Sequence, residues 1–410
     1  MPVPSGQTVG VAFGGPSVEH DVSIITAQQA MAVLGERHRV VPLYLAQDGR
    51  WWTGDALRDV SAFTQAPPRG ARPLQLRLGA GADCFVEPSG SRLRGDRPLG
   101  VDVVLNAIHG TGGEDGALLG ALELAGVPYV GRGVAAYAVG MDKHLAKLAL
   151  RDAGLEVLEH RRLERGDWEA DRAGVLAAVR DAIPLPAVVK PATLGSSIGV
   201  ARVEDAAALE EALELAFELD RQAIVEPFAT GAVELNCAVL GRPGGPLRVS
   251  EVERPLGSEA GLTFEDKYLR GAKGGKGHGG AKQAAAGAKA GEGGMAAADR
   301  VIPADVDPAL RRRVQEAAAT AHRALRVAGV ARYDFFVLGA DGDPARARIV
   351  VNEPNTVPGS FSFYLFEPVG LPFADLLDAL LEIALAEARE ERSTTRTFAS
   401  ALLERHARAA

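Results

Sequence analysis

Residues 352–366 read NEPNTVPGSFSFYLF, and the apolar run IVV directly precedes them. An earlier run, RYDFFV at 332–337, has the aromatic and β-branched composition of a strand. Because alternate residues of a strand point to the same face, Glu353 and Asn355 point together, and a paired strand can bring Asp334 alongside them. The sequence therefore predicts two neighbouring strands with three oxygen-bearing side chains on one face.

These three side chains have the chemistry of a magnesium site. Oxygen ligands without His or Cys suit Mg²⁺, which keeps water and is normally shared with substrate phosphates. A solvated hairpin is the alternative interpretation, but carboxylates inside apolar strands are costly to bury unless they are paired or bound to metal. We therefore predict that Asp334, Glu353 and Asn355 are metal ligands.

A second stretch, KPATLGSSIGV at 190–200, is typical of a loop that holds an anion. Lys190 ends one predicted strand, and the glycines after it let backbone amides approach a ligand closely. Ser196 and Ser197 add hydroxyl donors, and the lysine supplies a point charge. The pattern is not a P-loop, because the lysine precedes the glycines, and a simple turn remains the alternative.

The N-terminal part reads as a parallel α/β unit. TVGVAFGG at 8–15 predicts a strand and a tight turn, and apolar residues at helical spacing follow over 22–35. The runs RVVPLYLA, VDVVLNAIHG and VPYVG add short strands over roughly the first 130 residues. Ligands bind open α/β sheets at loops that follow the strands.

Two such loops, GGPSVEHDVS and HGTGGEDG, carry titratable side chains. They place Glu19, His20, His109 and Glu114 at neighbouring loop ends, where helix N-terminal amides are available. Each loop could alternatively be only a capped helix start, with Ser17 or Asp115 as the cap.

A second unit begins near Met141 and a third near residue 229, each with strands and helices of its own. Residues 271–298 break this pattern, because they are almost entirely Gly, Ala and Lys. They are interpreted either as a passive surface insertion or as a lid that closes over bound substrate.

The composition argues against two classes of binding partner, nucleic acids and acidic membranes. The net charge of -8 and the isoelectric point near 5.6 supply no basic field for nucleic acid or for an acidic membrane surface, so neither partner is expected. The two cysteines, Cys84 and Cys237, have no metal-like spacing. Without a leader-like segment or a long uncharged apolar run, a cytoplasmic protein is expected.

The motifs together resemble the D-alanine-D-alanine ligase family of the ATP-grasp superfamily. GGPSVEHDVS, then HGTGGEDG with PYVG and MDKHLAK, then KPATLGSSIGV, and finally RYDFFV with NEPNTVPG occur in that family's order, over nearly the whole chain. The resemblance implies an α/β ATP-grasp fold. Its parts would be a Rossmann-like N-terminal substrate-binding domain at 1–133, a central ATP-grasp subdomain at 134–228 and a C-terminal subdomain at 229–410, with ATP between the last two.

The resemblance also implies residue roles. ATP and two Mg²⁺ ions, with Mn²⁺ as an alternative, are the implied cofactors, and Asp334, Glu353 and Asn355 are the implied ligands of the ions. The strand AIVEPF would line the adenine pocket. The implied ATP-binding residues are Lys143, Lys190, Ser197, Glu226, Phe228 and Glu234.

The implied substrates are two D-alanines. In this family an acidic residue matching Glu19 receives the ammonium of the first D-alanine and links to residues matching Ser196 and Tyr268. Arg332 and the Gly359 amide would stabilise an oxyanion. Further substrate-binding residues implied are His20, His109, Lys267, Ser360, Tyr364 and Leu365.

The implied reaction passes through an acyl phosphate that the amine of the second D-alanine attacks, and a homodimer is also implied. The tail SFSFYLF departs from the family, since Tyr364 stands about where a serine would help receive the second substrate's carboxylate, with Ser360 or Ser362 as alternative hydroxyls. The same chemistry on a different second amino or hydroxy acid is therefore an alternative. A nucleotide-binding protein without ligase activity is another.

Overall fold

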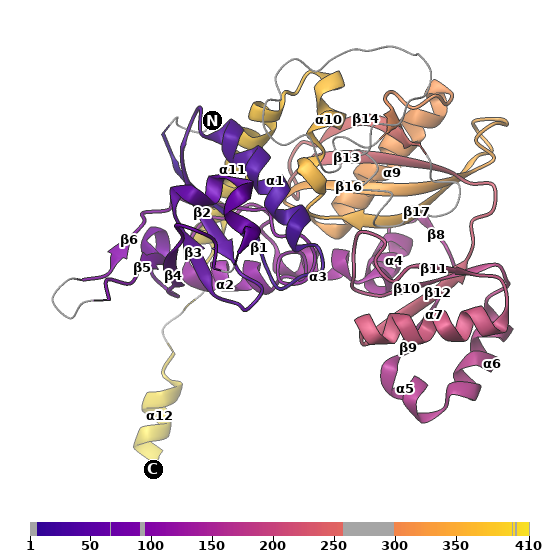
Figure 1. Ribbon diagram of the computed structural model, residues 1–410, viewed down its shortest axis with the longest axis horizontal. Coiled ribbons are helices and arrows are strands. Elements are labelled where there is room, and N and C mark those ends of the chain that lie inside the picture. The colour runs from indigo at the N-terminus through magenta and orange to yellow at the C-terminus, as the bar shows by residue number, and fades with distance from the viewer. Residues whose placement is uncertain are drawn as a thin grey trace.

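The computed structural model describes residues 6–65, 67–90, 95–256, 299–395, 397 and 400–409. The described residues form three β-sheets, and Figure 1 shows the first at one side of the molecule and the other two at the opposite side. The predicted segment 271–298 lies outside the described residues, as do Lys267 and Tyr268. No helix among the described residues is long and apolar enough to cross a membrane.

The first sheet has seven strands in the order β6-β5-β4-β3-β2-β1-β7. Only β2, β1 and β7 are parallel, as predicted for the α/β unit, whereas β3 to β6 extend the sheet in antiparallel pairs that were not predicted. The predicted VPYVG strand is reduced to one parallel bridge between Val104 and Tyr129. The strands are β1 (Thr8–Gly14), β2 (Arg39–Leu45), β3 (Trp51–Thr53), β4 (Arg72–Leu76), β5 (Phe85–Glu87), β6 (Arg97–Pro98) and β7 (Val103–Asn106).

Helices and short 3-10 helices connect and cover these strands. The helix predicted after the first strand is confirmed as α1, which packs on β1. Asp142 caps α4 by accepting from the backbone amides of His144 and Leu145. The elements are α1 (His20–Leu34), η1 (Asp55–Arg58), η2 (Val60–Thr64), η3 (Gly81–Asp83), α2 (Ala117–Ala125), α3 (Val134–Met141) and α4 (Lys143–Asp152).

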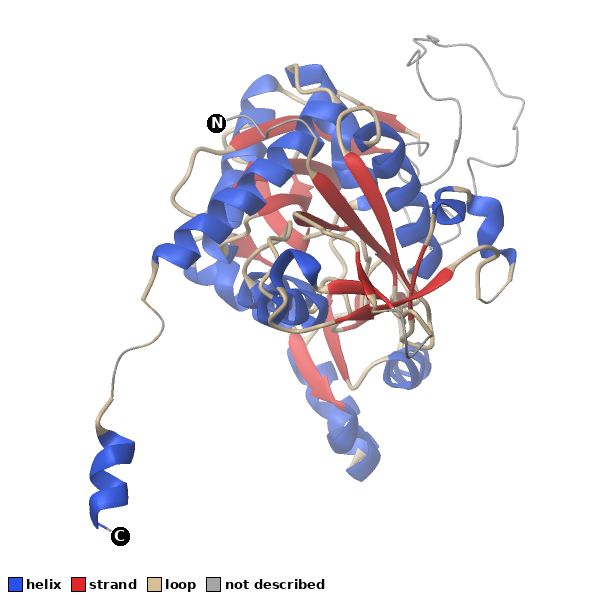
Figure 2. Cartoon of the chain, turned by 90° about the vertical axis from the view of Figure 1, so that its left-hand side faces the viewer, coloured by secondary structure: helices blue, strands red, loops and turns tan. Residues whose placement is uncertain are grey.

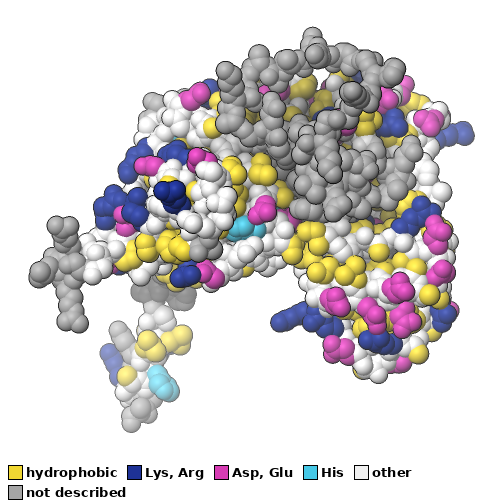
Figure 3. All heavy atoms as spheres, viewed as in Figure 1, with side chains coloured by type: hydrophobic (Ala, Val, Ile, Leu, Met, Phe, Trp, Pro, Cys, Tyr) yellow, Lys and Arg dark blue, Asp and Glu magenta, His cyan; other side chains and the backbone are white. Residues whose placement is uncertain are grey.

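The second sheet is small and antiparallel, in the order β11-β10-β12-β9. The predicted pair of strands around the Gly/Ser loop is confirmed as β10 and β11. Trp168, Leu213 and Phe217 belong to a separate apolar core between this sheet and its helices, and charged side chains of both signs cover the outside of this unit (Figure 3). Its elements are β9 (Arg161–Glu164), α5 (Arg165–Ala170), α6 (Arg172–Ala182), β10 (Ala187–Pro191), β11 (Ala201–Val203), α7 (Ala206–Leu219) and β12 (Gln222–Pro227).

The third sheet has six strands in the order β15-β14-β13-β16-β17-β8. The predicted pairing of RYDFFV with VNEPN is confirmed in the antiparallel pair β16 and β17. β8 lies before the second sheet in the sequence but runs parallel to β17, so the chain enters the third sheet, leaves it and returns. The strands are β8 (Glu156–Val157), β13 (Val233–Gly241), β14 (Arg248–Pro255), β15 (Arg300–Val301), β16 (Gly329–Leu338) and β17 (Arg348–Asn355).

One apolar core joins the first and third sheets. Leu376, Leu377, Leu380 and Leu381 of α11 recur at helical spacing and are buried in it. Figure 2 shows the helices packed around both sheets, with α12 standing away from the body. The remaining elements are α9 (Pro308–Leu325), η6 (Gly359–Ser362), α10 (Phe363–Phe366), η7 (Glu367–Val369), α11 (Phe373–Ser393) and α12 (Leu402–Ala409).

Candidate active site

A row of polar side chains crosses four strands of the third sheet. Strand register sets Asp334 opposite Glu353 on one side and opposite Asn236 on the other, and Asn236 lies opposite Glu253. Directly opposite residues point to the same face of a sheet. The predicted proximity of Asp334 and Glu353 is therefore confirmed, and Asn236 and Glu253 extend the row beyond the predicted set.

Arg332 and Asn355 flank the Asp334 carboxylate. Arg332 Nε lies 2.7 Å from Asp334 Oδ1 and its terminal nitrogen 2.8 Å from Oδ2, so the pair is bidentate. Asn355 Nδ2 donates to the same Oδ2 at 3.1 Å. Burial alone lowers the pKa of Arg332, but the adjacent Asp334 carboxylate raises this pKa well above its ordinary value. Arg332 therefore carries a permanent charge beside the predicted metal ligands.

The donor chemistry of this set fits Mg²⁺. Two carboxylates and an amide supply oxygen atoms, which Mg²⁺ prefers. Within the part of the chain that is described, no three His, Cys, Asp or Glu side chains gather as a metal site. Asp334, Glu353 and Asn355 would therefore need further oxygens from water and from ligand phosphates, which is how Mg²⁺ is usually held in phosphate-binding sites.

A cavity next to this row gathers residues from all parts of the chain. It lies where the loops after β1 and β7, the Gly/Ser loop and the end of β17 meet. Its lining consists of Glu19, His109, Glu114, Gly140, Met141, Lys143, Leu194, Gly195, Ser196, Arg332, Glu353, Pro354, Asn355, Val357, Pro358 and Gly359.

The Gly/Ser loop bends over this cavity. Ser196 Oγ donates a hydrogen bond to the Glu19 carboxylate. Ser196 and Ser197 both have positive φ, at 52° and 58°, a conformation that residues other than glycine rarely adopt. A Cβ on Gly195 would lie 2.7 Å from Glu19 Oε2, so a larger residue here would displace the Glu19 carboxylate.

Hydrogen bonds of Glu114 connect the HGTGGEDG loop with the segment after β17. Its carboxylate accepts from the amide of Gly110 at 3.0 Å, the hydroxyl of Thr356 at 3.0 Å and the amide of Val357 at 2.9 Å. Burial, together with the charge of Glu19, raises the pKa of Glu114 to about 7. Glu114 thus holds the segment that carries Gly359 against the N-terminal part of the chain.

His109 lines the same cavity in the neutral form. Its Nε2 lies 3.0 Å from Thr26 Oγ1. Burial, with a smaller contribution from Arg332, lowers the pKa of His109 to about 4. At neutral pH this side chain therefore offers a hydrogen bond rather than a charge.

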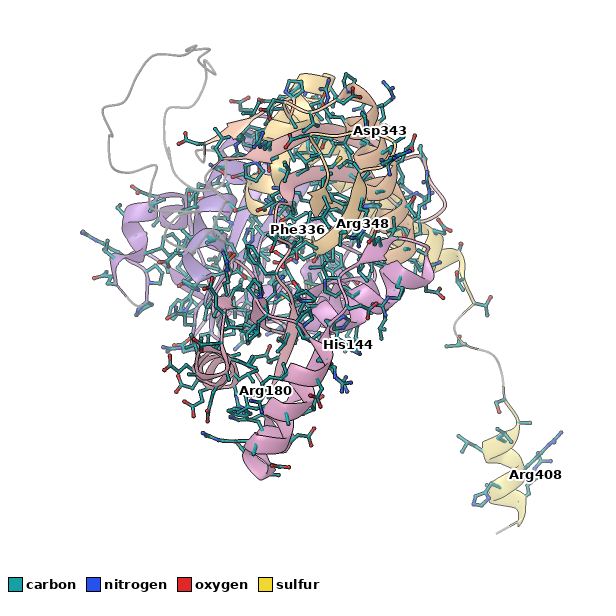
Figure 4. All side chains as sticks on the ribbon, turned by 90° about the vertical axis from the view of Figure 1, so that its right-hand side faces the viewer. His144, Arg180, Phe336, Asp343, Arg348 and Arg408 are labelled. Atoms are coloured by element: carbon teal, nitrogen blue, oxygen red, sulfur yellow. The ribbon has the colours of Figure 1, made fainter. Side chains whose placement is uncertain are left out.

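Lysines approach the cavity from α4 and β10. Lys143 Nζ donates to the Leu194 carbonyl, and burial lowers the pKa of Lys143. Lys190 Nζ donates to Glu226 and lies 3.0 Å from Asn352 Oδ1 on β17. It also lies 6.0 Å from the ring centroid of Phe336, which Figure 4 labels on the third sheet. Lys190 therefore bridges the second and third sheets.

The predicted adenine-binding residues lie around the connection from β12 to β13. The guanidinium of Arg202 stacks on the Phe228 ring at 4.2 Å. A groove beside this connection is lined by residues that include Val157, Phe228, Ala229 and Leu338. Glu234 lies on β13 opposite Phe336, two residues before Asn236, so it points to the same face of the sheet as the polar row.

The aromatic tail forms a left-handed turn followed by a short helix. Ser360, Phe361 and Ser362 have φ of 53°, 52° and 51° in succession, and all three are buried. Leu365 is fully buried in the main core. The Tyr364 ring lies under the guanidinium of Arg300, 3.8 Å from it, and Arg300 in turn pairs with Glu253 at 2.9 Å. Contacts thus run from the polar row to the aromatic tail.

The structure brings most predicted catalytic residues into one cavity. Glu19, Ser196, Arg332 and Gly359 all line it, and the predicted proximity of Glu19, His109 and Glu114 is confirmed. His20 is not in the lining; its ring contacts the Gly15 carbonyl and the Tyr44 hydroxyl, and its substrate role stays a prediction. The other predicted residues outside the lining are Lys190, Ser197, Glu226, Phe228, Glu234, Asp334, Ser360, Tyr364 and Leu365.

Sequence reasoning missed several polar residues. Lys147 carries the one local signal, because it lies four residues after Lys143 on the same helical face. No local pattern marks the others, which are Asn236, Glu253, Arg300, Asn352 and Thr356.

Comparisons with known proteins show the family of the chain. The family model described as "D-ala D-ala ligase N-terminus" matches residues 8–132, and that described as "D-ala D-ala ligase C-terminus" matches residues 149–282 and 288–382. The chain is 35% identical to a D-alanine-D-alanine ligase of Chlorobium phaeovibrioides over 92% of this chain and 97% of that one.

Two solved structures are similar over nearly the full length. The D-alanine-D-alanine ligase from Coxiella burnetii has a TM-score of 0.74 and 27% identity, covering 95% of this chain and 97% of its own. The VanG D-Ala:D-Ser ligase from Enterococcus faecalis has a TM-score of 0.71 and 28% identity, covering 92% of this chain and 99% of its own.

Proposed function

The chain belongs to the D-alanine-D-alanine ligase family, and on that premise we propose that it joins two D-alanines into D-alanyl-D-alanine for peptidoglycan synthesis, with conversion of ATP to ADP and phosphate. The family has the ATP-grasp fold and is ATP-dependent. One observation carries the proposal. A single cavity gathers Glu19, Ser196, Arg332 and the Gly359 segment beside the carboxylate pair of β16 and β17.

Glu19 and Ser196 would receive the first substrate. The carboxylate of Glu19 is a counter-ion for the ammonium group of D-alanine, and its hydrogen bond with Ser196 supports this role because it orients the carboxylate toward the cavity. Tyr268 would complete this set but lies outside the described residues. The carboxylate of the bound D-alanine then attacks the γ-phosphate of ATP, forming an acyl phosphate and releasing ADP.

Arg332 and the Gly359 amide would serve the second step. The amine of the second D-alanine attacks the acyl carbon, a negative charge develops on the carbonyl oxygen, and phosphate leaves. Arg332 keeps its charge beside Asp334, which supports a role in stabilising that oxyanion. Glu114 would keep Gly359 in place through its hydrogen bonds with Thr356 and Val357.

Lys143, Lys190 and the metal set would hold the polyphosphate. Two Mg²⁺ ions at Asp334, Glu353 and Asn355, or Mn²⁺ in their place, would offset the charge of the phosphates when bound. The oxygen donors on one sheet face support this assignment. Ser197, Glu226, Phe228 and Glu234 are the remaining residues proposed for ATP.

A different second substrate is the one alternative that a particular observation favours. Tyr364 stands in the tail about where a serine is usual and packs under Arg300 of β15, and a structurally similar relative is described as a D-Ala:D-Ser ligase. A tyrosine ring beside a guanidinium changes both the space and the charge offered to a second substrate. Tyr364 would therefore influence which second substrate is accepted. His20, His109, Lys267, Ser360 and Leu365 are the further residues proposed for substrate binding.

The organisation of the protein follows from the same premise. We propose a cytoplasmic homodimer whose chain divides into an N-terminal domain at 1–133, a central subdomain at 134–228 and a C-terminal subdomain at 229–410. The separate apolar core of the small second sheet supports the central unit.

The deciding experiment measures ADP and phosphate release with D-alanine as the sole amino acid, and then with a panel of second substrates that includes D-serine, glycine and D-lactate. We expect D-alanine alone to support turnover and D-alanyl-D-alanine to be the product. If ADP forms only when another second substrate is added, the alternative replaces the proposal; ADP formation under no condition contradicts both.

A further inference from the structure

A buried lysine behind the cavity has no part in the chemistry above. Lys143 and Lys147 lie four residues apart on α4 and therefore share a face. Lys143 lines the cavity, whereas Lys147 is only 1% exposed. The ammonium nitrogen of Lys147 lies 3.0 Å from Glu226 Oε2 on β12, and the Glu226 side chain is equally buried. Lys147 therefore contacts Glu226 rather than the cavity that Lys143 lines.

Glu226 is shared between two ammonium groups. Lys147 lies at its Oε2, and Lys190 donates to its Oε1. Burial alone would raise the pKa of Glu226, but the two lysines lower this pKa to about 2. Lys190 also contacts Asn352 Oδ1, next to the predicted metal ligand Glu353. The Glu226 carboxylate therefore remains charged at any pH near neutral and holds Lys190 away from solvent.

The Glu226 carboxylate and the phosphates of ATP would compete for the ammonium group of Lys190. The Lys190 ammonium pairs with Glu226, and the proposed function also needs this ammonium at the phosphates of ATP. If Lys190 were the sole counter-ion, its transfer would leave a buried carboxylate uncompensated, which is strongly unfavourable. With Lys147 present, Glu226 stays paired when Lys190 moves.

We propose that Lys147 is a positioning residue that neutralises Glu226 and so lets Lys190 pass from Glu226 to the phosphates of ATP. The inference rests on the proposed function, because it takes ATP as the ligand. Lys147 acts through Glu226 and Lys190 and touches neither substrate. Its effect should appear in phosphate binding and be absent from the binding of a nucleoside without phosphates.

The test compares nucleotide binding by the full-length protein and its variants, measured by calorimetric titration with Mg²⁺ and a non-hydrolysable ATP analogue, and by competition with adenosine. Lys147→Met keeps a long apolar side chain but removes the charge. We expect the dissociation constant of the ATP analogue to rise about 10- to 100-fold, the worth of one charge-assisted hydrogen bond, and that of adenosine to change less than about twofold.

Two further variants separate charge from packing. In a Glu226→Gln background there is no carboxylate to neutralise, so adding Lys147→Met should change the affinity for the ATP analogue by less than about threefold. Arg180→Met, in the last turn of α6 (labelled in Figure 4), removes an exposed positive charge as a matched control and should leave affinity unchanged. Circular dichroism checks that each variant is folded.

Three outcomes would overturn the inference. The first is an unchanged affinity of Lys147→Met for the ATP analogue. The second is an equal loss of affinity for adenosine, and the third is a loss of about tenfold or more when Lys147→Met is added to the Glu226→Gln background. A merely structural role of Lys147 would produce the second and the third. If the Lys147→Met variant does not fold, Lys147→Gln, which also removes the charge, takes its place in both comparisons. Absence of ATP binding by the unaltered protein would contradict the proposed function itself and is distinguishable from all three.

Discussion

The Glu19 carboxylate, at the start of α1, accepts a hydrogen bond from the hydroxyl of Ser196, 177 residues later in the chain. The contact joins the first sheet to the loop of the second sheet across the candidate cavity. It therefore links the position of the Gly/Ser loop to the residue proposed to receive the first substrate.

Replacing Ser196 by Ala removes this contact. Because a hydrogen bond to a charged acceptor contributes about 1.5–3 kcal/mol, we expect kcat/KM for D-alanine to fall about 10- to 100-fold. Initial rates of phosphate release at varied D-alanine measure this effect. Ser393→Ala, at the exposed end of α11, is a control that should behave as the unaltered protein. An unchanged kcat/KM would mean that Glu19 needs no orientation by Ser196.

Glu353→Gln should abolish turnover and leave the fold intact, because a neutral amide cannot replace a carboxylate that binds Mg²⁺. Steady-state ADP release and the unfolding temperature measure the two effects. Asp343→Asn, in the exposed turn of the same hairpin (labelled in Figure 4), is the matched control and should retain activity. Full activity of the Glu353 variant would exclude this residue from the metal site.

The raised pKa of Glu114 predicts a pH-dependent stability. Burial raises its pKa from 4.5 to about 7, so the folded protein binds a proton that the unfolded chain releases between these values. Stability contributed by this group is present in full below pH 4.5 and is lost as the pH rises to about 7. Urea unfolding at a series of pH values should show a smaller decrease for Glu114→Gln than for the unaltered protein. Identical pH profiles for the two proteins would show that Glu114 does not titrate in this range.

Tyr364→Phe keeps the ring under Arg300 but removes the hydroxyl group. If this hydroxyl receives the carboxylate of the second substrate, the KM of the second D-alanine should rise about tenfold, with the first D-alanine unaffected. Two-site kinetic analysis separates the two constants. If both KM values are unchanged, the Tyr364 hydroxyl does not contact the second substrate, and only the ring can contribute to the pocket.

Ser362→Gly should stabilise the protein. Ser362 has φ of 51° within three successive left-handed residues, and its buried hydroxyl has no hydrogen-bond partner among the described residues. A left-handed conformation costs a residue other than glycine about 1–2 kcal/mol, partly offset by the greater freedom of glycine in the unfolded chain. We expect a gain of about 1 kcal/mol in the free energy of unfolding, measured with denaturant. A loss of stability would show that the Ser362 side chain contributes packing that outweighs the strain.

The sequence alone determined the local elements and the chemistry that they carry. Strand alternation predicted that Glu353 and Asn355 share a face with Asp334, because side-chain direction in a strand depends only on position. Helical spacing and glycine-rich loops likewise predicted α1 and the turn between β10 and β11. The order of four motifs was enough to predict the family.

Only the tertiary structure decided which distant groups meet. That Lys147 pairs with Glu226, that Glu114 holds the segment after β17, and that Arg300 covers Tyr364 depend on how three sheets pack, and no local periodicity encodes such packing. The antiparallel strands β3 to β6 were missed for the same reason, since such short strands are stabilised by their neighbours in the sheet more than by their own sequence. Apart from the Arg332–Asp334 pair, the buried charges of this site described above have partners that lie far away in the chain.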